Sequence, residues 1–95
     1  MPERGYNTFH GIVKGRVQGV GYRVYTMESA RRHGVVGWVK NLADRSVEVY
    51  AQGDDLSLTE LLTDLYKGPI NGHVEDIDIT WSRVEIEATN FEIRR

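Results

Sequence analysis

The sequence predicts an α+β fold in which a small, mostly antiparallel sheet carries two helices on one face. Apolar residues that alternate or are β-branched occur in five short runs, and two longer stretches have the apolar spacing of a helix. Their order is βαββαβ with one small extra strand. This order is typical of the split βαβ, or ferredoxin-like, α/β sandwich.

The first strand and the first helix are expected at residues 8–14 and 23–33. Apolar residues alternate along the strand, and the helix has basic residues in its last turn and Gly34 as its stop. The residues expected in the core are Phe9, Gly11, Val13, Val24, Met27 and Ala30.

A β-hairpin is expected next. Residues 35–40 are β-branched and aromatic, residues 41–45 form a short turn, and residues 47–52 alternate between apolar and polar side chains. We expect the first two strands of the chain to lie side by side in the sheet. Asn41, at the end of one strand, would then lie near the loop that leaves the other.

The second helix has the clearest pattern, and Gly68-Pro69 ends it. Leucines recur at i, i+3, i+4 and i+7, namely Leu58, Leu61, Leu62 and Leu65. Its start has two candidate caps. One is Ser57 with Glu60 as a capping box, and the other is Asp54 or Asp55, one turn earlier.

The last part of the chain is expected to be rich in strands. Residues 76–81 alternate, residues 84–87 continue the alternation after a bulge, and residues 91–94 form a short final strand. Trp38 and Trp81 are expected in the core rather than on a surface that stacks a ligand.

Composition indicates an ordinary globular protein. The chain has 95 residues, 40% hydrophobic and 27% charged, and we expect one domain over residues 1–95 with a core from about residue 7. The absence of cysteine excludes disulfides and thiolate zinc sites. No apolar run reaches membrane-spanning length, and the polar N-terminal residues lack the apolar stretch of a signal peptide. We therefore expect a cytoplasmic protein with no membrane partner, and a monomer.

Charge is distributed unevenly along the chain. The net charge of −2 disfavours nucleic acid as a partner. Residues 1–45 carry a net charge of +5, whereas residues 46–95 carry −7. A small anionic ligand would therefore meet a favourable field in the first half of the chain.

A glycine-rich stretch connects the first strand to the first helix. It reads Gly15-Arg16-Val17-Gln18-Gly19-Val20-Gly21-Tyr22-Arg23. Its glycines indicate a tightly bent backbone with uncovered N–H groups, which favour an anion at a helix N-terminus. Arg23 adds a planar guanidinium suited to phosphate. The spacing fits neither nucleotide-binding glycine motif, and a plain turn without a ligand is the alternative.

Other catalytic chemistry has little support. The chain has no cysteine nucleophile, its serines lack an elbow motif, and His10, His33 and His73 do not have the spacing of metal ligands. A helix start and a solvated strand face explain the acidic pairs in residues 54–55 and 76–78. We therefore expect no metal and no cofactor.

The glycine-rich nonapeptide resembles the first signature of the acylphosphatase family, Gly-x-Val-Gln-Gly-Val-x-Phe/Tyr-Arg. A second stretch resembles the other signature of that family: Gly37-Trp38-Val39-Lys40-Asn41, then Val47-Glu48, then Gly53. The two stretches have the order and separation of the family, and the resemblance extends to Phe91-Glu92-Ile93.

The resemblance implies hydrolysis of the carboxyl–phosphate bond of acyl phosphates to a carboxylate and inorganic phosphate, without a metal ion. It implies that Arg23 binds the phosphate and that Asn41 positions the attacking water. The residues it assigns to the phosphate-binding loop are Gly15, Arg16, Val17, Gln18, Gly19, Val20, Gly21 and Tyr22.

One residue departs from the family pattern. Arg45 stands in the hairpin turn at a position where the second signature usually has glycine. A non-glycine residue in the left-handed conformation costs about 1–2 kcal/mol. We therefore expect a turn that is either strained or differently shaped.

Three other functions are compatible with the same fold. A non-catalytic ferredoxin-like module that binds a small phosphorylated ligand requires the loop and Arg23, but not Asn41. RNA binding requires exposed aromatic residues on the open sheet face and a basic surface. The accessory domain of hydrogenase-maturation carbamoyltransferases also resembles an acylphosphatase, but those chains are long and rich in cysteine.

Overall fold

The order of elements is the predicted one. The computed structural model describes residues 7–95, and the polar N-terminal stretch on which the targeting prediction depended lies outside the described residues. The elements within residues 7–95 are β1 (Asn7–Arg16), α1 (Tyr22–Arg32), β2 (Val36–Asn41), β3 (Val47–Gly53), α2 (Asp55–Lys67), β4 (His73–Ser82) and β5 (Phe91–Arg94). The pattern βαββαβ with one extra strand is therefore confirmed.

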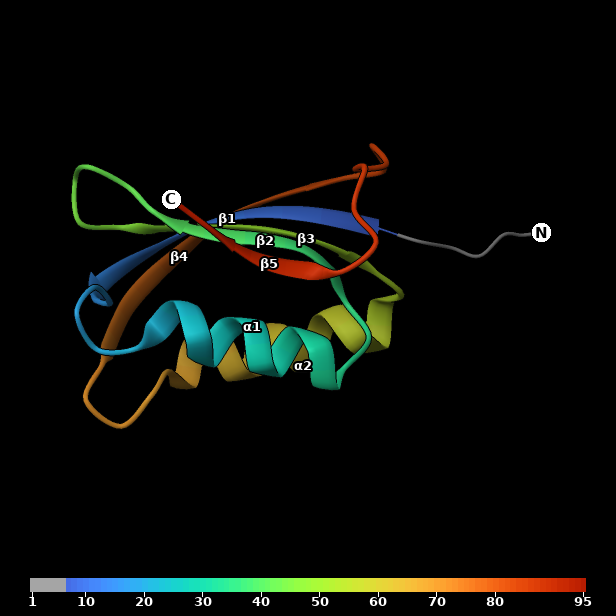
Figure 1. Ribbon diagram of the computed structural model, residues 1–95. Coiled ribbons are helices and arrows are strands. Elements are labelled where there is room, and N and C mark those ends of the chain that lie inside the picture. The colour runs from blue at the N-terminus through green and yellow to red at the C-terminus, as the bar shows by residue number, and fades with distance from the viewer. Residues whose placement is uncertain (1–6) are drawn as a thin grey trace.

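The strands form one sheet in the order β4-β1-β3-β2-β5, and both helices pack against the same face of it (Figure 1). Strand β1 pairs antiparallel with β3 and β4, and β2 pairs antiparallel with β3. Only the pairing of β2 with β5 is parallel among the described strands. The ferredoxin-like, mostly antiparallel sandwich is confirmed.

The expected adjacency of the first two strands is wrong, because β3 lies between β1 and β2. Since both strands run antiparallel to β3, they run in the same direction as each other. Their C-terminal ends consequently lie at the same edge of the sheet. The loop after β1 and Asn41 at the end of β2 therefore come together without the two strands being neighbours.

The core lies between the helices and the covered face of the sheet. Alternate residues of β1 and β3 point into it, as the sequence predicted, and the leucines of α2 close it from the other side. The fully buried members from these elements are Phe9, Val13, Val47, Val49, Ala51, Leu58, Leu61 and Leu65. Burial of one such large side chain contributes about 1.5–3 kcal/mol relative to exposure.

The predicted apolar stripe of helix α1 is confirmed in part: Ala30 is fully buried and Met27 packs against the core, but Val24 does not. Val24 is 48% exposed, and the buried residues of the helix are Tyr22, Thr26, Ser29 and Ala30. Polar contacts with α2 select this face, because the Tyr22 hydroxyl donates to the Leu65 carbonyl at 2.7 Å and the Ser29 hydroxyl to Asp64 Oδ2 at 2.6 Å. A purely apolar pattern gives no indication of these contacts.

Helix α2 begins one turn before the predicted capping box. Its N-cap is Asp54, whose Oδ1 accepts a hydrogen bond from the Ser57 N–H at 2.8 Å. The Ser57–Glu60 box is thus wrong and the alternative cap is confirmed. The helix ends at Lys67 with Gly68 as its C-cap, as predicted.

The predicted strand at residues 84–87 is wrong. The segment between β4 and β5 has no regular structure, because side chains of the sheet bind its backbone. The Thr8 hydroxyl donates to the Val84 carbonyl at 2.7 Å, and Gln52 Oε1 accepts from the Ile86 N–H at 2.7 Å. These bonds replace the ladder that a strand would require.

Both tryptophans were expected in the core, and this expectation is wrong. Trp38 projects from β2 onto the sheet face that carries no helix, where the Arg94 guanidinium lies 4.8 Å from its ring centroid. Trp81 contacts Phe9 edge-on at 5.5 Å between centroids and is 51% exposed. Because β4 is an edge strand, one side of the Trp81 ring stays open to solvent.

Candidate active site

The loop between β1 and α1 has the bent backbone that the sequence predicted. Gly19 and Gly21 adopt left-handed conformations with φ of 76° and 80°, and Gly21 is the N-cap of α1. A side chain at either position would meet open space, so conformation rather than crowding requires glycine there. The two left-handed residues turn the chain sharply into the helix.

The turn leaves a run of backbone N–H groups without partners. Within residues 7–95, the N–H groups of residues 18 to 23 donate no hydrogen bond to another residue. They precede or open α1, where the helix dipole adds partial positive charge. The loop therefore has the donors that an anion requires.

The remaining loop residues do not share one environment. Gly15 lies at a β-bulge, where an added Cβ would approach the His73 carbonyl oxygen to 2.2 Å. Glycine is therefore required here for the close approach of β1 and β4, and not for binding a ligand. Gly15, Arg16 and Gln18 line a separate hollow of about 180 Å³ beside Arg45. Val20 packs against the core.

The predicted catalytic pair comes together in one pocket of about 260 Å³. Arg23 lies in the first turn of α1, and Asn41 is the last residue of β2. The pocket also contains Val17, Gly19, Gly21 and Tyr22 from the predicted loop. The Arg23 guanidinium makes no ion pair or hydrogen bond within the described residues, so it is available to a ligand.

Asn41 carries an unusual feature for a side chain in a hairpin. Its Oδ1 atom is buried and has no hydrogen-bond partner within residues 7–95. A buried carbonyl oxygen without a partner costs about 1–3 kcal/mol. Inside a pocket, such an acceptor is suited to a water molecule or a ligand group that donates a hydrogen bond.

The side chain of Gln18 fixes the loop to the hairpin. Its Nε2 donates to the carbonyl oxygens of Leu42 and Ser46, both at 2.8 Å. Leu42 directly follows Asn41, so this amide fixes the distance between the loop and the end of β2. Gln18 thus faces the hairpin through its side chain, which the sequence pattern alone did not indicate.

The hairpin turn has the conformation suspected from its sequence. Arg45 has φ of 77°, the only positive value for a non-glycine residue among residues 7–95. Asp44 stabilises the same turn by accepting from the Ser46 N–H at 3.0 Å and from the Ser46 hydroxyl. The hydrogen bonds from Ser46 lower the pKa of the Asp44 carboxyl below its usual value.

The pocket is lined by basic and apolar residues. Arg23 and Arg95 are part of its lining, and no acidic side chain of the described residues is. Tyr22 contributes a ring whose hydroxyl is bonded to α2, and burial raises the pKa of that hydroxyl. Tyr22 therefore shapes the pocket and does not supply a proton near neutral pH.

The sequence did not predict Val24, Ile93 and Arg95 as part of the pocket. Ile93 and Arg95 reach it because β5 pairs in parallel with β2, next to Asn41. The alternation of residues 91, 93 and 95 in the sequence indicated that these residues share one face of the strand. The sequence did not indicate that β5 pairs with β2. Within residues 7–95, no group of three His, Asp or Glu side chains is placed to hold a metal ion.

The sequence matches the family model described as Acylphosphatase over residues 9–93. It is 41% identical over 83 residues to the acylphosphatase of Salinibacter ruber, and the match covers 87% of each chain. The chain belongs to the acylphosphatase family. It is also 40% identical over 83 residues to the acylphosphatase of Oceanobacillus iheyensis, covering 86% of this chain and 91% of that relative.

Solved structures agree with this family membership. The structure matches the crystal structure of acylphosphatase from Bacillus subtilis with a TM-score of 0.91 and 35% identity, over 94% of this chain and 99% of that one. The predicted resemblance to the acylphosphatase family is thereby confirmed. No helix among the described residues has both the length and the apolar character to cross a membrane.

Proposed function

We propose that this chain hydrolyses acyl phosphates to a carboxylate and inorganic phosphate by in-line attack of water on phosphorus. The observation that carries the proposal is the buried, unpartnered Oδ1 of Asn41 in the same pocket as the free Arg23 guanidinium. Phosphate binding relies on donors, whereas an acceptor in this position can hold the water molecule that hydrolysis consumes.

The phosphoryl group binds at the N-terminus of α1. The free N–H groups of residues 18 to 23 and the Arg23 guanidinium donate to its oxygens. Charge on these oxygens changes as the bond to the carboxylate breaks, and donors already in place stabilise it without reorganisation. These N–H groups and the Arg23 guanidinium therefore stabilise the transition state electrostatically.

Asn41 orients the nucleophile. Its Oδ1 accepts a hydrogen bond from water and fixes the direction from which the water approaches phosphorus. Because the water is already oriented, the reaction loses less entropy on reaching the transition state. An amide does not remove a proton at neutral pH, so a phosphoryl oxygen of the substrate takes it. The departing carboxylate is a stable anion, and no strong general acid is needed.

One turnover assay distinguishes an acylphosphatase from a module that only binds a phosphorylated ligand. Release of benzoate from benzoyl phosphate in the presence of EDTA is expected for the wild type. Arg23→Ala should abolish both turnover and inhibition by phosphate, because the main cation of the site is lost. Arg83→Ala removes a guanidinium from the segment after β4, outside this pocket, and should change neither quantity.

Two outcomes would contradict the proposal. A wild type that binds phosphate but does not release benzoate would support the non-catalytic module. Activity that survives in Arg23→Ala would exclude the assigned phosphate site. The monomeric state and the cytoplasmic location stay predictions, and light scattering on the purified chain checks the first.

A further inference from the structure

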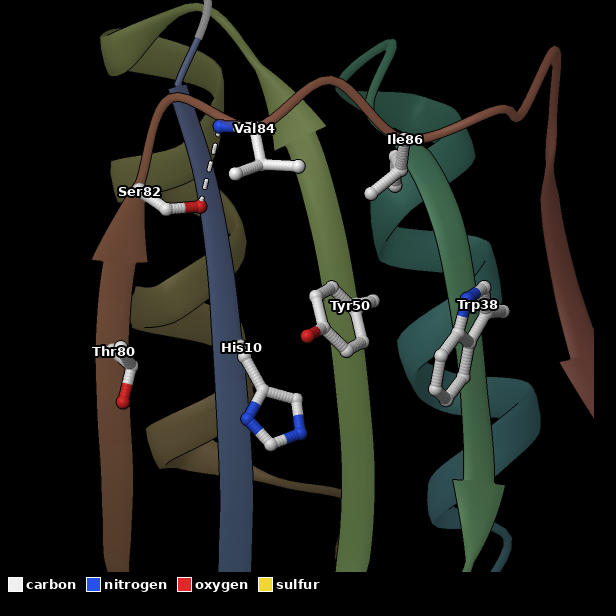
Figure 2. Close-up of a pocket in the computed structure, with 7 residues that line it drawn as sticks. All are labelled: His10, Trp38, Tyr50, Thr80, Ser82, Val84 and Ile86. Atoms are coloured by element: carbon white, nitrogen blue, oxygen red, sulfur yellow. Dashed lines mark hydrogen bonds between the residues drawn. The ribbon is translucent and has the colours of Figure 1, made fainter.

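A second pocket, of about 470 Å³, opens on the sheet face that carries no helix (Figure 2). No residue of the described part of the chain lines both this pocket and the pocket of Arg23 and Asn41. Its volume is within the usual range of roughly 300–1,000 Å³ for small-molecule sites. The proposed hydrolysis makes no use of it.

Three aromatic rings from neighbouring strands form the floor. Tyr50 of β3 lies between His10 of β1 and Trp38 of β2, with ring centroids 4.5 Å and 5.1 Å away. All three residues are on the face opposite the core, so the core does not require them. Figure 2 shows the His10 and Tyr50 rings broadside from the solvent side.

The floor is held in place at both ends. His10 Nε2 lies 2.7 Å from Glu48 Oε2, and the Arg94 guanidinium lies over the Trp38 ring. Cross-strand aromatic pairs also stabilise a sheet, and this contribution alone would explain a flat row of rings. It does not explain the wall that stands beside the row.

The wall is the segment that follows β4. The hydrogen bonds of Thr8 and Gln52 fix its backbone across the end of the sheet. Val84 and Ile86 project from it on the side of the rings (Figure 2). Val84 is 67% exposed, so the apolar wall does not collapse onto the floor. A fixed wall beside an aromatic floor makes a slot for a flat molecule.

One edge of the slot is polar and uncharged. Thr80 and Ser82 of β4 line it with hydroxyl groups, and the Tyr50 hydroxyl points toward that side (Figure 2). Among residues 7–95, the only ionisable side chain in the lining besides Tyr50 is His10, which already contacts Glu48. The Arg94 guanidinium lies over the Trp38 ring and does not line the slot. The slot therefore offers stacking and hydrogen bonds, and no Lys or Arg of residues 7–95 is part of its lining.

We propose that this slot binds an uncharged, planar heteroaromatic molecule of purine size. The ring stacks on Tyr50 between His10 and Trp38, its apolar edge meets Val84 and Ile86, and its polar edge meets the hydroxyls of β4. Aromatic platforms of this kind bind bases through their π faces. A lining without a Lys or Arg among the described residues distinguishes this site from a surface that binds RNA.

The test is a titration of the ¹⁵N-labelled full chain with adenosine, followed by amide chemical shifts. Saturable shifts are expected near residues 10, 38, 50 and 84–86, and not in the loop at residues 17–23. Val84→Asp alters an exposed side chain of the wall and should weaken adenosine binding about tenfold or more. Tyr50→Ser should do the same, and Trp81→Phe is the matched aromatic control that should not.

Hydrolysis of benzoyl phosphate by Val84→Asp should equal that of the wild type, which separates this proposal from the proposed function. The inference is overturned if adenosine gives no saturable shifts, or if the shifts map to the loop at residues 17–23. It is also overturned if oligouridylate binds much more tightly than adenosine, since phosphate would then dominate recognition.

Discussion

The contact between Gln18 and the hairpin predicts a loss of turnover without a loss of phosphate binding. Gln18→Met keeps the length of the side chain and removes both hydrogen bonds to the carbonyl oxygens of Leu42 and Ser46. Asn41 precedes Leu42, so its amide is expected to lose its fixed position relative to the loop. The loop N–H groups and Arg23 are unchanged.

The magnitude follows from the hydrogen bonds. Two ordinary hydrogen bonds contribute about 1–3 kcal/mol together. Each carbonyl keeps a backbone donor, Arg45 N–H at 3.2 Å for Leu42 and Leu42 N–H at 2.9 Å for Ser46. No acceptor is orphaned, so the free energy of unfolding should fall by roughly 1–2 kcal/mol, or about 4–16 °C in Tm.

Thermal unfolding and steady-state kinetics on benzoyl phosphate measure the two effects. We expect kcat to fall about tenfold, while the inhibition constant of phosphate changes little. Gln52→Met is the matched control. It removes the hydrogen bond to Ile86 at the far end of the sheet and should lower Tm without changing kcat. Full turnover in a destabilised Gln18→Met would refute the positioning argument.

Two further predictions concern the hairpin turn. Arg45→Gly relieves about 1–2 kcal/mol of left-handed strain in the folded state. Glycine also raises the entropy of the unfolded chain, which lowers the free energy of unfolding by about 0.4–1 kcal/mol. The strain relief is the larger effect, so Tm should rise by a few degrees. A lower Tm would argue that φ at Arg45 is not strained. Hydrogen bonds from Ser46 lower the pKa of Asp44 in the folded state, so its carboxylate adds stability above the usual Asp pKa near 3.9. That stability is lost as pH falls through the folded pKa. Asp44→Ala should therefore lower Tm at pH 7, and the gap to the wild type should close in acid; a gap that is constant with pH would contradict this.

The sequence was sufficient for the helices and strands and their order, except for the strand expected at residues 84–87, because apolar periodicity is a local property. It also indicated the bent loop, since Gly19 and Gly21 adopt the left-handed conformations that only glycine takes readily. For the same reason, the sequence predicted that the turn at Arg45 is either strained or differently shaped, and its φ of 77° is the strained alternative. These inferences needed no knowledge of which strands are neighbours.

Failures arose where distant segments meet. The place of β3 between β1 and β2 and the parallel pairing of β5 depend on the whole topology, and they bring Ile93 and Arg95 to the pocket. The tryptophans were misplaced because hydrophobicity does not say which face of a strand is covered. The missing strand at 84–87 reflects hydrogen bonds from Thr8 and Gln52, far away in sequence.

The most direct test of the proposed mechanism is the kinetic comparison of Asn41→Ala with Asn71→Ala. Asn71 is an exposed asparagine in the connection before β4 and serves as the control. For Asn41→Ala, we predict that kcat on benzoyl phosphate falls about a hundredfold or more, while inhibition by phosphate stays within about twofold of the wild type. Full turnover in Asn41→Ala would contradict the claim that this side chain directs water to phosphorus.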